Sequence, residues 1–292
     1  MHIRLTTAHA QVEIDPHLGA SVISYRLSDG TDIFRPAAKS EWNAFRAACF
    51  PMVPWCNRIA GGVTDLNGQF HKIAPAHPEH PLPIHGSAAL RPWKVKTGRG
   101  DELHLALSHD QPAPFKYDAE IHYHLSGTDL SIKLTVTNRA DRPLPYGMGL
   151  HPWFPRTNKV GLRAPATHFQ TVDQDRLPVG EEAISARPDW DFSDVALLPD
   201  DLIDTGFSGW DGMAVIGRDD GWGIEIRTNP PLECYQLYSP DEDSGFFCFE
   251  PVSHPINAHN MTGHPGLWPL DPGASASVTF TFAPTVDMLT KA

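Results

Sequence analysis

The sequence predicts an all-β protein built as a large sandwich of antiparallel sheets. Apolar and polar residues alternate along many short segments, 23 glycines and 28 prolines are spread over the whole chain, and helix-period stretches are scarce. With 292 residues, 41% of them hydrophobic and 20% charged, the chain can bury a sizeable core. We expect residues 1–292 to form a single domain.

Five segments alternate most cleanly, and each is predicted to be a half-buried strand. They are Leu103–Leu107, Ala119–Leu125, Leu130–Val136, Trp222–Ile226 and Val278–Phe282. Turn sequences rich in Gly, Asp and Pro lie between the runs, at residues 126–129, 219–221 and 271–273. No fixed repeat period is visible, which favours a sandwich over a propeller.

Two segments depart from the strand pattern. Residues Ser40–Ala48 are the best helix candidate, with Ser40 as the cap and Pro51 and Pro54 ending the helix soon afterwards. The stretch Asp173–Asp204 is polar, contains proline and is weakly patterned. We expect it to form a long excursion over one face of the protein rather than a second domain.

Composition excludes some functions. The formal net charge is −12 and no Lys/Arg-rich tract exists, which argues against nucleic-acid binding and, weakly, against an anionic substrate. The amino terminus lacks the apolar segment of a secretory signal, and no run of about 18 apolar residues predicts a membrane span. The four cysteines (Cys49, Cys56, Cys234, Cys248) contain no C-x-x-C pair. We expect four thiols in a reducing cytoplasm.

Glu250 is the first candidate for chemistry. It follows the run Phe246–Phe249, which holds three phenylalanines, and it precedes Pro251. A carboxylate at the end of so apolar a strand is desolvated unless something pairs with it, and desolvation raises its pKa toward the strength of a useful base. The alternative is a glutamate at a strand end that points into solvent or is hydrogen-bonded to a backbone amide.

Three further polar residues lie in apolar or glycine-rich segments. His151, between Leu150 and two aromatic residues, is either a hydrogen-bonded core histidine or a proton donor near neutral pH. His85, before Gly86, is either a turn residue or a polar contact where glycine lets a ligand approach. Arg58 either forms an ion pair or holds sugar oxygens with its forked donors.

Together these segments resemble the aldose 1-epimerase (galactose mutarotase) family. The resemblance is carried, in order, by Asn57-Arg58-Ile59, His85-Gly86, the segment 147–154 ending in His151-Pro152-Trp153-Phe154, and the segment 250–260 beginning Glu250-Pro251. It implies an antiparallel β-supersandwich with few short helices. It also implies a cofactor-free isomerase, a mutarotase that interconverts the α and β anomers of a hexose by acid–base ring opening and closure.

The resemblance assigns roles to individual residues. Glu250 is the expected base for the anomeric hydroxyl, and His151 the expected acid for the ring oxygen. The expected substrate-binding residues are Arg58, His85, Asp204, Asn57 and Gln236. Asp204 departs from the family in its context, because Thr205 follows it where His or Asn is common.

The resemblance also bears on partners. The expected partner is a small-molecule sugar, either a free aldose or a hexose carrying an acidic or phosphate group. We expect no metal, no cofactor, no nucleic acid and no membrane, and a monomer or homodimer.

Alternative functions remain open on the sequence. Asp204 and Glu250 are also compatible with a two-carboxylate glycosidase, which leaves His151 without a role. A non-catalytic sugar-binding module is the other alternative, although binding alone requires neither a base nor an acid. The aromatic residues Trp55, Trp153, Phe207 and Trp210 either stack on a sugar or belong to the core.

Histidine pairs suggest a metal site. The pairs are His122-x-His124 and His77-x-x-His80. On a strand, His122 and His124 share a face with Glu120, opposite the apolar residues, so the pattern predicts a solvated face rather than a metal site.

Overall fold

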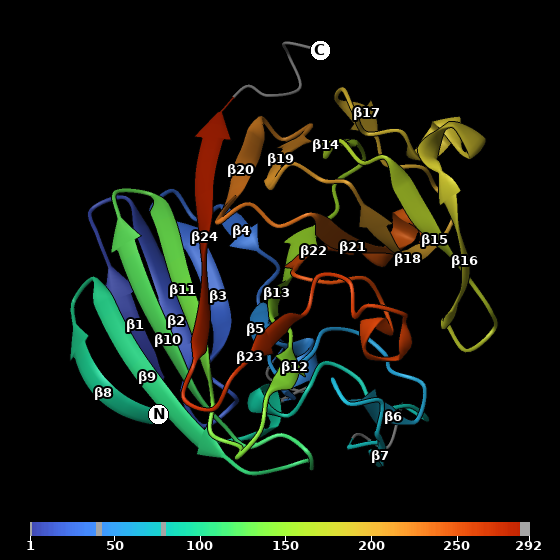
Figure 1. The fold of residues 1–292 in the computed structure, drawn as a ribbon. Helices are drawn as coiled ribbons and strands as arrows, with labels where there is room; N and C mark the ends of the chain where they lie inside the picture. The colour runs from blue at the N-terminus through green and yellow to red at the C-terminus, as the bar shows by residue number, and fades with distance from the viewer. Residues whose placement is uncertain (1, 39–42, 77–79, 287–292) are drawn as a thin grey trace.

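The computed structural model describes residues 2–38, 43–76 and 80–286, which form two large antiparallel sheets (Figure 1). Within these residues the first sheet has eleven strands, in the order β1-β2-β3-β5-β13-β22-β21-β18-β15-β16 with β4 beside β3. Its strands are β1 (Ile3–Thr6), β2 (Ala10–Asp15), β3 (Ser21–Leu27), β4 (Asp32–Phe34), β5 (Cys49–Met52), β13 (Gly149–Pro155), β15 (His168–Val172), β16 (Pro178–Ala183), β18 (Ile203–Ser208), β21 (Cys234–Ser239) and β22 (Phe246–Val252).

The second sheet has nine strands within the same residues, in the order β17-β14-β19-β20-β24-β11-β10-β9-β8. They are β8 (Lys94–Arg99), β9 (Glu102–His109), β10 (Tyr117–Ser126), β11 (Asp129–Asn138), β14 (Val160–Arg163), β17 (Ala196–Leu197), β19 (Met213–Arg218), β20 (Trp222–Asn229) and β24 (Ser275–Val286). Two small sheets pair β12 (Leu144–Tyr146) with β23 (Trp268–Leu270) and β6 (Gly62–Thr64) with β7 (Phe70–Lys72). The helical elements in the described part of the chain are short 3₁₀ turns. The predicted all-β antiparallel supersandwich is confirmed.

The five strands predicted from alternation are β9, β10, β11, β20 and β24. In β10 every second residue from Tyr117 to Leu125 is buried, as the period of a strand with one solvated face requires. The buried faces of both sheets belong to one hydrophobic cluster. Phe34 of the first sheet and Phe282 of the second meet edge to face, with ring centroids 5.0 Å apart. The apolar periodicity therefore builds the core between the two sheets.

The expected helix at 40–48 differs from the structure. Ser40 lies outside the described residues, and the described part holds one 3₁₀ turn, η2 (Ala44–Arg46). Its cap is Asn43, whose Oδ1 accepts a hydrogen bond from the Phe45 amide at 2.9 Å. The strand β5 starts at Cys49, so the turn cannot continue as a helix beyond Ala48.

The stretch Asp173–Asp204 also differs from its prediction. Instead of covering one face, it supplies an edge strand to each large sheet, β16 to the first and β17 to the second. Trp190 anchors the segment between them by packing against Phe169 at 5.2 Å. The polar composition of the stretch reflects the exposure of edge strands.

The four cysteines are buried free thiols. Among the described residues, no helix combines the length and the hydrophobicity needed to cross a bilayer.

Candidate active site

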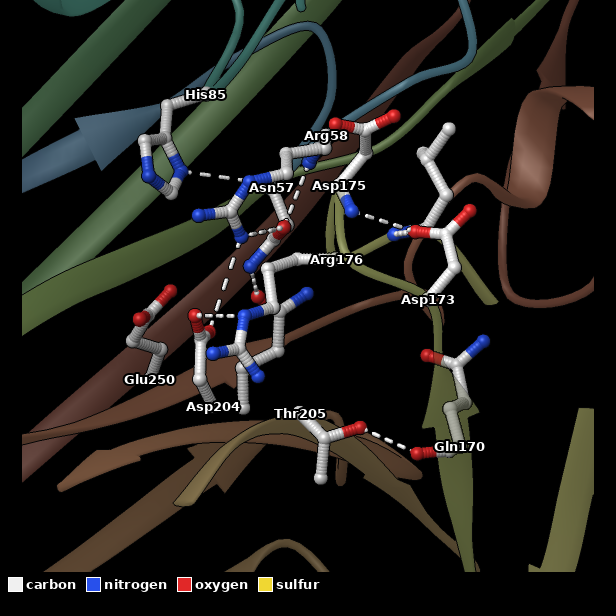
Figure 2. Close-up of polar contacts among 12 residues, drawn as sticks. Asn57, Arg58, His85, Gln170, Asp173, Asp175, Arg176, Asp204, Thr205 and Glu250 are labelled. Atoms are coloured by element: carbon white, nitrogen blue, oxygen red, sulfur yellow. Dashed lines mark hydrogen bonds and ion pairs between the residues drawn. The ribbon is translucent and has the colours of Figure 1, made fainter. Parts of the chain in front are cut away.

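Two loops from distant parts of the sequence are joined by reciprocal hydrogen bonds. The Asn57 amide donates to His85 Nδ1 at 3.3 Å, and the His85 amide donates to the Asn57 carbonyl oxygen at 3.1 Å (Figure 2). Both residues have positive φ, 51° for Asn57 and 58° for His85, a conformation that costs energy outside glycine. Since Nδ1 accepts the hydrogen bond, the proton of the neutral His85 ring resides on Nε2.

Gly86 explains why the second loop contains glycine. Its φ is +69°, and a Cβ atom at this position would lie 2.1 Å from the Val53 carbonyl oxygen. Val53 and Gly86 also form a β-bridge. Glycine therefore allows the backbone contact that holds His85 beside Asn57.

His151 and Glu250 face each other from neighbouring strands of the first sheet. The register pairs Gly149 with Val252 and Trp153 with Cys248, which places His151 of β13 opposite Glu250 of β22. His151 Nε2 lies 3.2 Å from Glu250 Oε1. The His151 ring is held in place by Phe50, on which it stacks with centroids 4.5 Å apart.

Burial sets the protonation of this pair. Glu250 is 3% exposed, and desolvation raises its pKa well above the usual value, reinforced by Asp204 and opposed by Arg58. Desolvation lowers the pKa of His151 to about 3. Glu250 Oε2 and His151 Nδ1 have no hydrogen-bond partner within the described chain. Because burial favours neutral forms of both groups, the pair holds a single proton over a wide pH range.

Asp204 lies on β18 between two arginines (Figure 2). Arg58 Nη1 is 3.8 Å from Asp204 Oδ1, and Arg176 Nε is 3.4 Å from Oδ2. Burial raises the pKa of Asp204, and the two guanidinium groups oppose that rise. Thr205 faces the other side of the strand, where its hydroxyl donates to the Gln170 carbonyl oxygen at 2.6 Å. Thr205 therefore does not change the contacts of Asp204.

Arg176 is a site residue that the sequence did not predict. The side chain of Asp173 accepts hydrogen bonds from the amides of Asp175 and Leu177, both at 2.9 Å, and so folds the turn that carries Arg176. Arg176 has a φ of 61°, and its side chain reaches Asp204 (Figure 2). Asp173 is a residue type that commonly starts turns, so the turn itself could have been predicted from the sequence. No local feature indicates that Arg176 pairs with Asp204.

Asn57 and Gln236 form a second layer of polar contacts. The Asn57 side-chain amide donates to Gln236 Oε1, while Asn57 Oδ1 accepts from the backbone of Arg58 at 2.7 Å and from Arg58 Nη1 at 3.2 Å. Gln236 is 2% exposed and is not among the residues that line the cleft. Its register partner on β22 is Glu250. In this structure Gln236 supports Asn57 from behind.

A cleft of about 230 Å³ brings most of the predicted residues together. Of the predicted site residues, Asn57, Arg58, His85, His151, Asp204 and Glu250 line it. The other lining residues were not predicted as substrate-binding or catalytic groups; they are Asn43, Phe45, Arg46, Phe50, His80, Ile84, Trp153, Tyr238 and Phe246. Of the four aromatic residues considered for stacking, Trp153 lines the cleft, whereas Trp55, Phe207 and Trp210 belong to the core. The cleft thus combines apolar rings with converging polar groups, as ligand sites commonly do.

His254 supports the floor of the loop before Asn57. Its Nε2 accepts from the Cys56 amide at 3.0 Å, and its Nδ1 donates to the Pro255 carbonyl oxygen at 2.8 Å. The ring is packed so tightly that a Cβ atom on Gly147 would lie 2.2 Å from His254 Cδ2. Both hydrogen bonds require the neutral ring, and burial lowers its pKa to about 4.

This histidine predicts acid sensitivity of the fold. In the unfolded chain His254 is protonated below about pH 6.5, whereas in the native state it stays neutral until the pH falls to about 4. The free energy of unfolding should therefore fall by about 1.4 kcal/mol per pH unit from this group as the pH drops between those values. Urea unfolding at pH 7, 6 and 5 should show a shallower pH dependence for His254→Gln than for the wild type or the exposed control His124→Gln. Equal slopes in all three proteins would refute the prediction.

Comparison with known proteins gives a consistent result. The sequence profile of the family described as Aldose 1-epimerase matches residues 1–283. The uncharacterized protein YphB of Escherichia coli K12 is 31% identical over 279 residues, which cover 93% of this chain and 95% of the relative. The crystal structure of an Escherichia coli K12 protein provisionally described as an aldose 1-epimerase is 28% identical, with a TM-score of 0.92 over 98% of this chain and 99% of the other. A galactose mutarotase-like protein from Clostridium acetobutylicum shares the fold, with a TM-score of 0.84 at 17% identity and coverage of 98% and 95%.

Proposed function

Because the chain belongs to the aldose 1-epimerase family, we propose that it is a mutarotase that interconverts the α and β anomers of a hexose. The observation that carries the proposal is the buried pair of His151 Nε2 and Glu250 Oε1, 3.2 Å apart on the wall of the cleft. A base and an acid side by side are what reversible ring opening requires. The same pair gives His151 a role that a two-carboxylate glycosidase would not.

The proposed reaction balances around a single proton on this pair. With Glu250 ionised and His151 protonated, Glu250 removes the proton of the C1 hydroxyl while His151 protonates the ring oxygen. The bond between C1 and the ring oxygen breaks, the aldehyde forms, and both side chains become neutral. After rotation about the C1–C2 bond, the same steps run backwards on the other carbonyl face and restore the starting charges. Burial stabilises the neutral forms of both groups, which are those that accompany the open aldehyde.

The other cleft residues orient the sugar in this proposal. Arg58 and His85 Nε2 are hydrogen-bond donors to sugar oxygens, and Asp204 accepts from sugar hydroxyls. Asn57 acts through the backbone and guanidinium of Arg58, and Gln236 acts through Asn57. Held in this way, the donors need little reorganisation when the reaction proceeds.

The charge of the cleft bears on the substrate. Arg46 and Arg58 line it together with Asp204, whereas the raised pKa of Glu250 favours the neutral acid. We therefore propose that a hexose with an acidic or phosphate group is accepted alongside neutral aldoses, despite the overall charge of −12.

The four buried thiols suit a cytoplasmic enzyme. We take residues 1–292 to be one domain acting as a monomer or homodimer.

NMR exchange spectroscopy tests the function directly. The protein should accelerate exchange between the anomeric signals of at least one sugar in a panel of neutral aldoses, uronic acids and hexose phosphates. It should not hydrolyse aryl glycosides of the same sugars. Sugar binding without faster anomer exchange would support a binding module instead, and hydrolysis would support a glycosidase.

The pH dependence distinguishes two versions of the mechanism. If the pair must hold one proton, kcat/KM falls as the pH rises through the raised pKa of Glu250. If Glu250 acts as a free carboxylate beside a neutral histidine, kcat/KM rises instead over the same range. We expect the fall, measured after subtraction of the uncatalysed rate at each pH.

Arg176 predicts a moderate effect on binding. Its side chain is 36% exposed and pairs with Asp204, so its loss should cost about 0.2–1 kcal/mol in substrate binding, a rise in KM of up to about five-fold with kcat unchanged. The variant is Arg176→Ala. The matched control is Arg187→Ala, because Arg187 also lies in the stretch 173–204 and forms an ion pair, with Asp189, away from Asp204. Steady-state polarimetry measures both constants. An equal rise in KM for both variants would exclude a specific role for Arg176.

A further inference from the structure

A cluster of metal-ligating side chains lies on the second sheet, away from the cleft. His122 of β10 is the direct register partner of His104 of β9, and Glu120 precedes His122 by two residues on the same face. One ligand atom from each of the three residues lies within 4.8 Å of the others. The cleft residues His151, Asp204 and Glu250 instead come from strands of the first sheet. The cluster is therefore separate from the proposed active site.

Its contacts leave the cluster poorly satisfied. The rings of His104 and His122 are stacked with centroids 3.6 Å apart. His104 Nε2 is hidden from solvent and makes no hydrogen bond within the described chain, although Glu120 Oε2 lies 3.4 Å away. A buried polar atom without a hydrogen bond lowers the stability of the fold. A cation bound between His104 Nε2 and Glu120 Oε2 would give both atoms a partner.

We propose that His104, His122 and Glu120 bind a divalent transition-metal ion, with zinc as the preferred probe. Two imidazole nitrogens and one carboxylate oxygen are a common zinc donor set, and water completes the tetrahedron. Tetrahedral zinc with bonds of about 2.1 Å holds its donor atoms roughly 3.4 Å apart. His104 Nε2 and Glu120 Oε2 are 3.4 Å apart, and the third donor lies within 4.8 Å of both, so a small side-chain movement suffices to close the site around an ion. Glu120 and His122 are exposed and free to make that movement.

The neighbours of the cluster set its limits. Lys133 on β11 is the register partner of His122 and opposes a cation, whereas Glu102 on β9 lies opposite His124 on the same face and favours one. The solvated face was predicted from the pattern of one strand, β10, on which His122, His124 and Glu120 are exposed. The adjacent strand adds His104, which is partly buried and directly opposite His122. The ion would thus bridge β9 and β10 and stabilise their pairing.

Zinc titration of the full-length, untagged protein tests the site after treatment with a chelator. A chromophoric competitor should report one more zinc equivalent in the wild type than in His104→Asn or His122→Asn. Loss of a direct ligand should weaken binding by more than the roughly 10–100-fold that outer-shell changes cost. The matched control is His124→Asn, which removes a histidine from the same face of the same strand and should retain the equivalent.

A second measurement separates ligation from misfolding. Zinc should raise the thermal midpoint of the wild type and of His124→Asn, but not of the other two variants, and circular dichroism should show that all four proteins are folded. Equal zinc stoichiometry in the wild type and His104→Asn, loss of zinc in His124→Asn, or no zinc bound by the wild type would each overturn the proposal. Mutarotation should be unchanged by the chelator.

Discussion

Glu250→Gln should lower kcat/KM for mutarotation by about 10²–10⁴-fold while leaving the fold intact. The amide has nearly the shape of the carboxylate, but it cannot take the proton of the C1 hydroxyl. Glu250 is buried with one oxygen that has no hydrogen-bond partner among the described residues, so the native site bears the cost of a desolvated acid. The amide is uncharged, like the neutral acid that burial favours, so the urea midpoint of the variant should stay close to that of the wild type.

The matched control for this variant is Glu182→Gln, an exposed glutamate on the edge strand β16. Polarimetry on freshly dissolved sugar, corrected for the uncatalysed rate, gives kcat/KM for both. The control should match the wild type. A Glu250→Gln enzyme that retains near-wild-type activity would remove Glu250 from the proposed reaction.

The second large effect is expected for His151→Gln. Glutamine can place an amide nitrogen near the position of His151 Nε2, 3.2 Å from Glu250, but it cannot deliver a proton to the ring oxygen. We expect a loss of about 10²–10⁴-fold in kcat/KM. The ring also stacks on Phe50, so some stability should be lost as well, and the urea midpoint must be measured alongside the rate.

Combining the two substitutions tests whether the residues act as one unit. If the single proton passes between Glu250, the sugar and His151, the double variant should be no slower than the slower single variant. Losses that multiply would instead show two independent contributions. In that event the shared-proton mechanism is wrong even if both residues contribute to the rate.

The fold was largely predictable from local patterns. Alternation in Ala119–Leu125 and Leu130–Val136 identifies strands because a strand with one solvated face must bury every second residue. The same reasoning failed for Asp173–Asp204, whose edge strands are polar and exposed and so leave no apolar period. In the predicted helix at 40–48, the described residues hold only a 3₁₀ turn capped by Asn43, and the predicted cap Ser40 lies outside the described residues.

The candidate site divides in the same way. Local sequence is enough to show that Glu250 follows an apolar strand and that His85 precedes a glycine, and the family resemblance adds the order of the motifs. Which of these side chains contact each other depends on the three-dimensional fold. The β13–β22 register sets His151 against Glu250, and a turn built by Asp173 brings Arg176 to Asp204. The β9–β10 register likewise makes His104 the partner of His122, which the sequence of one strand alone could not show. Register and loop closure depend on interactions between residues far apart in the chain, and local periodicity carries no information about them.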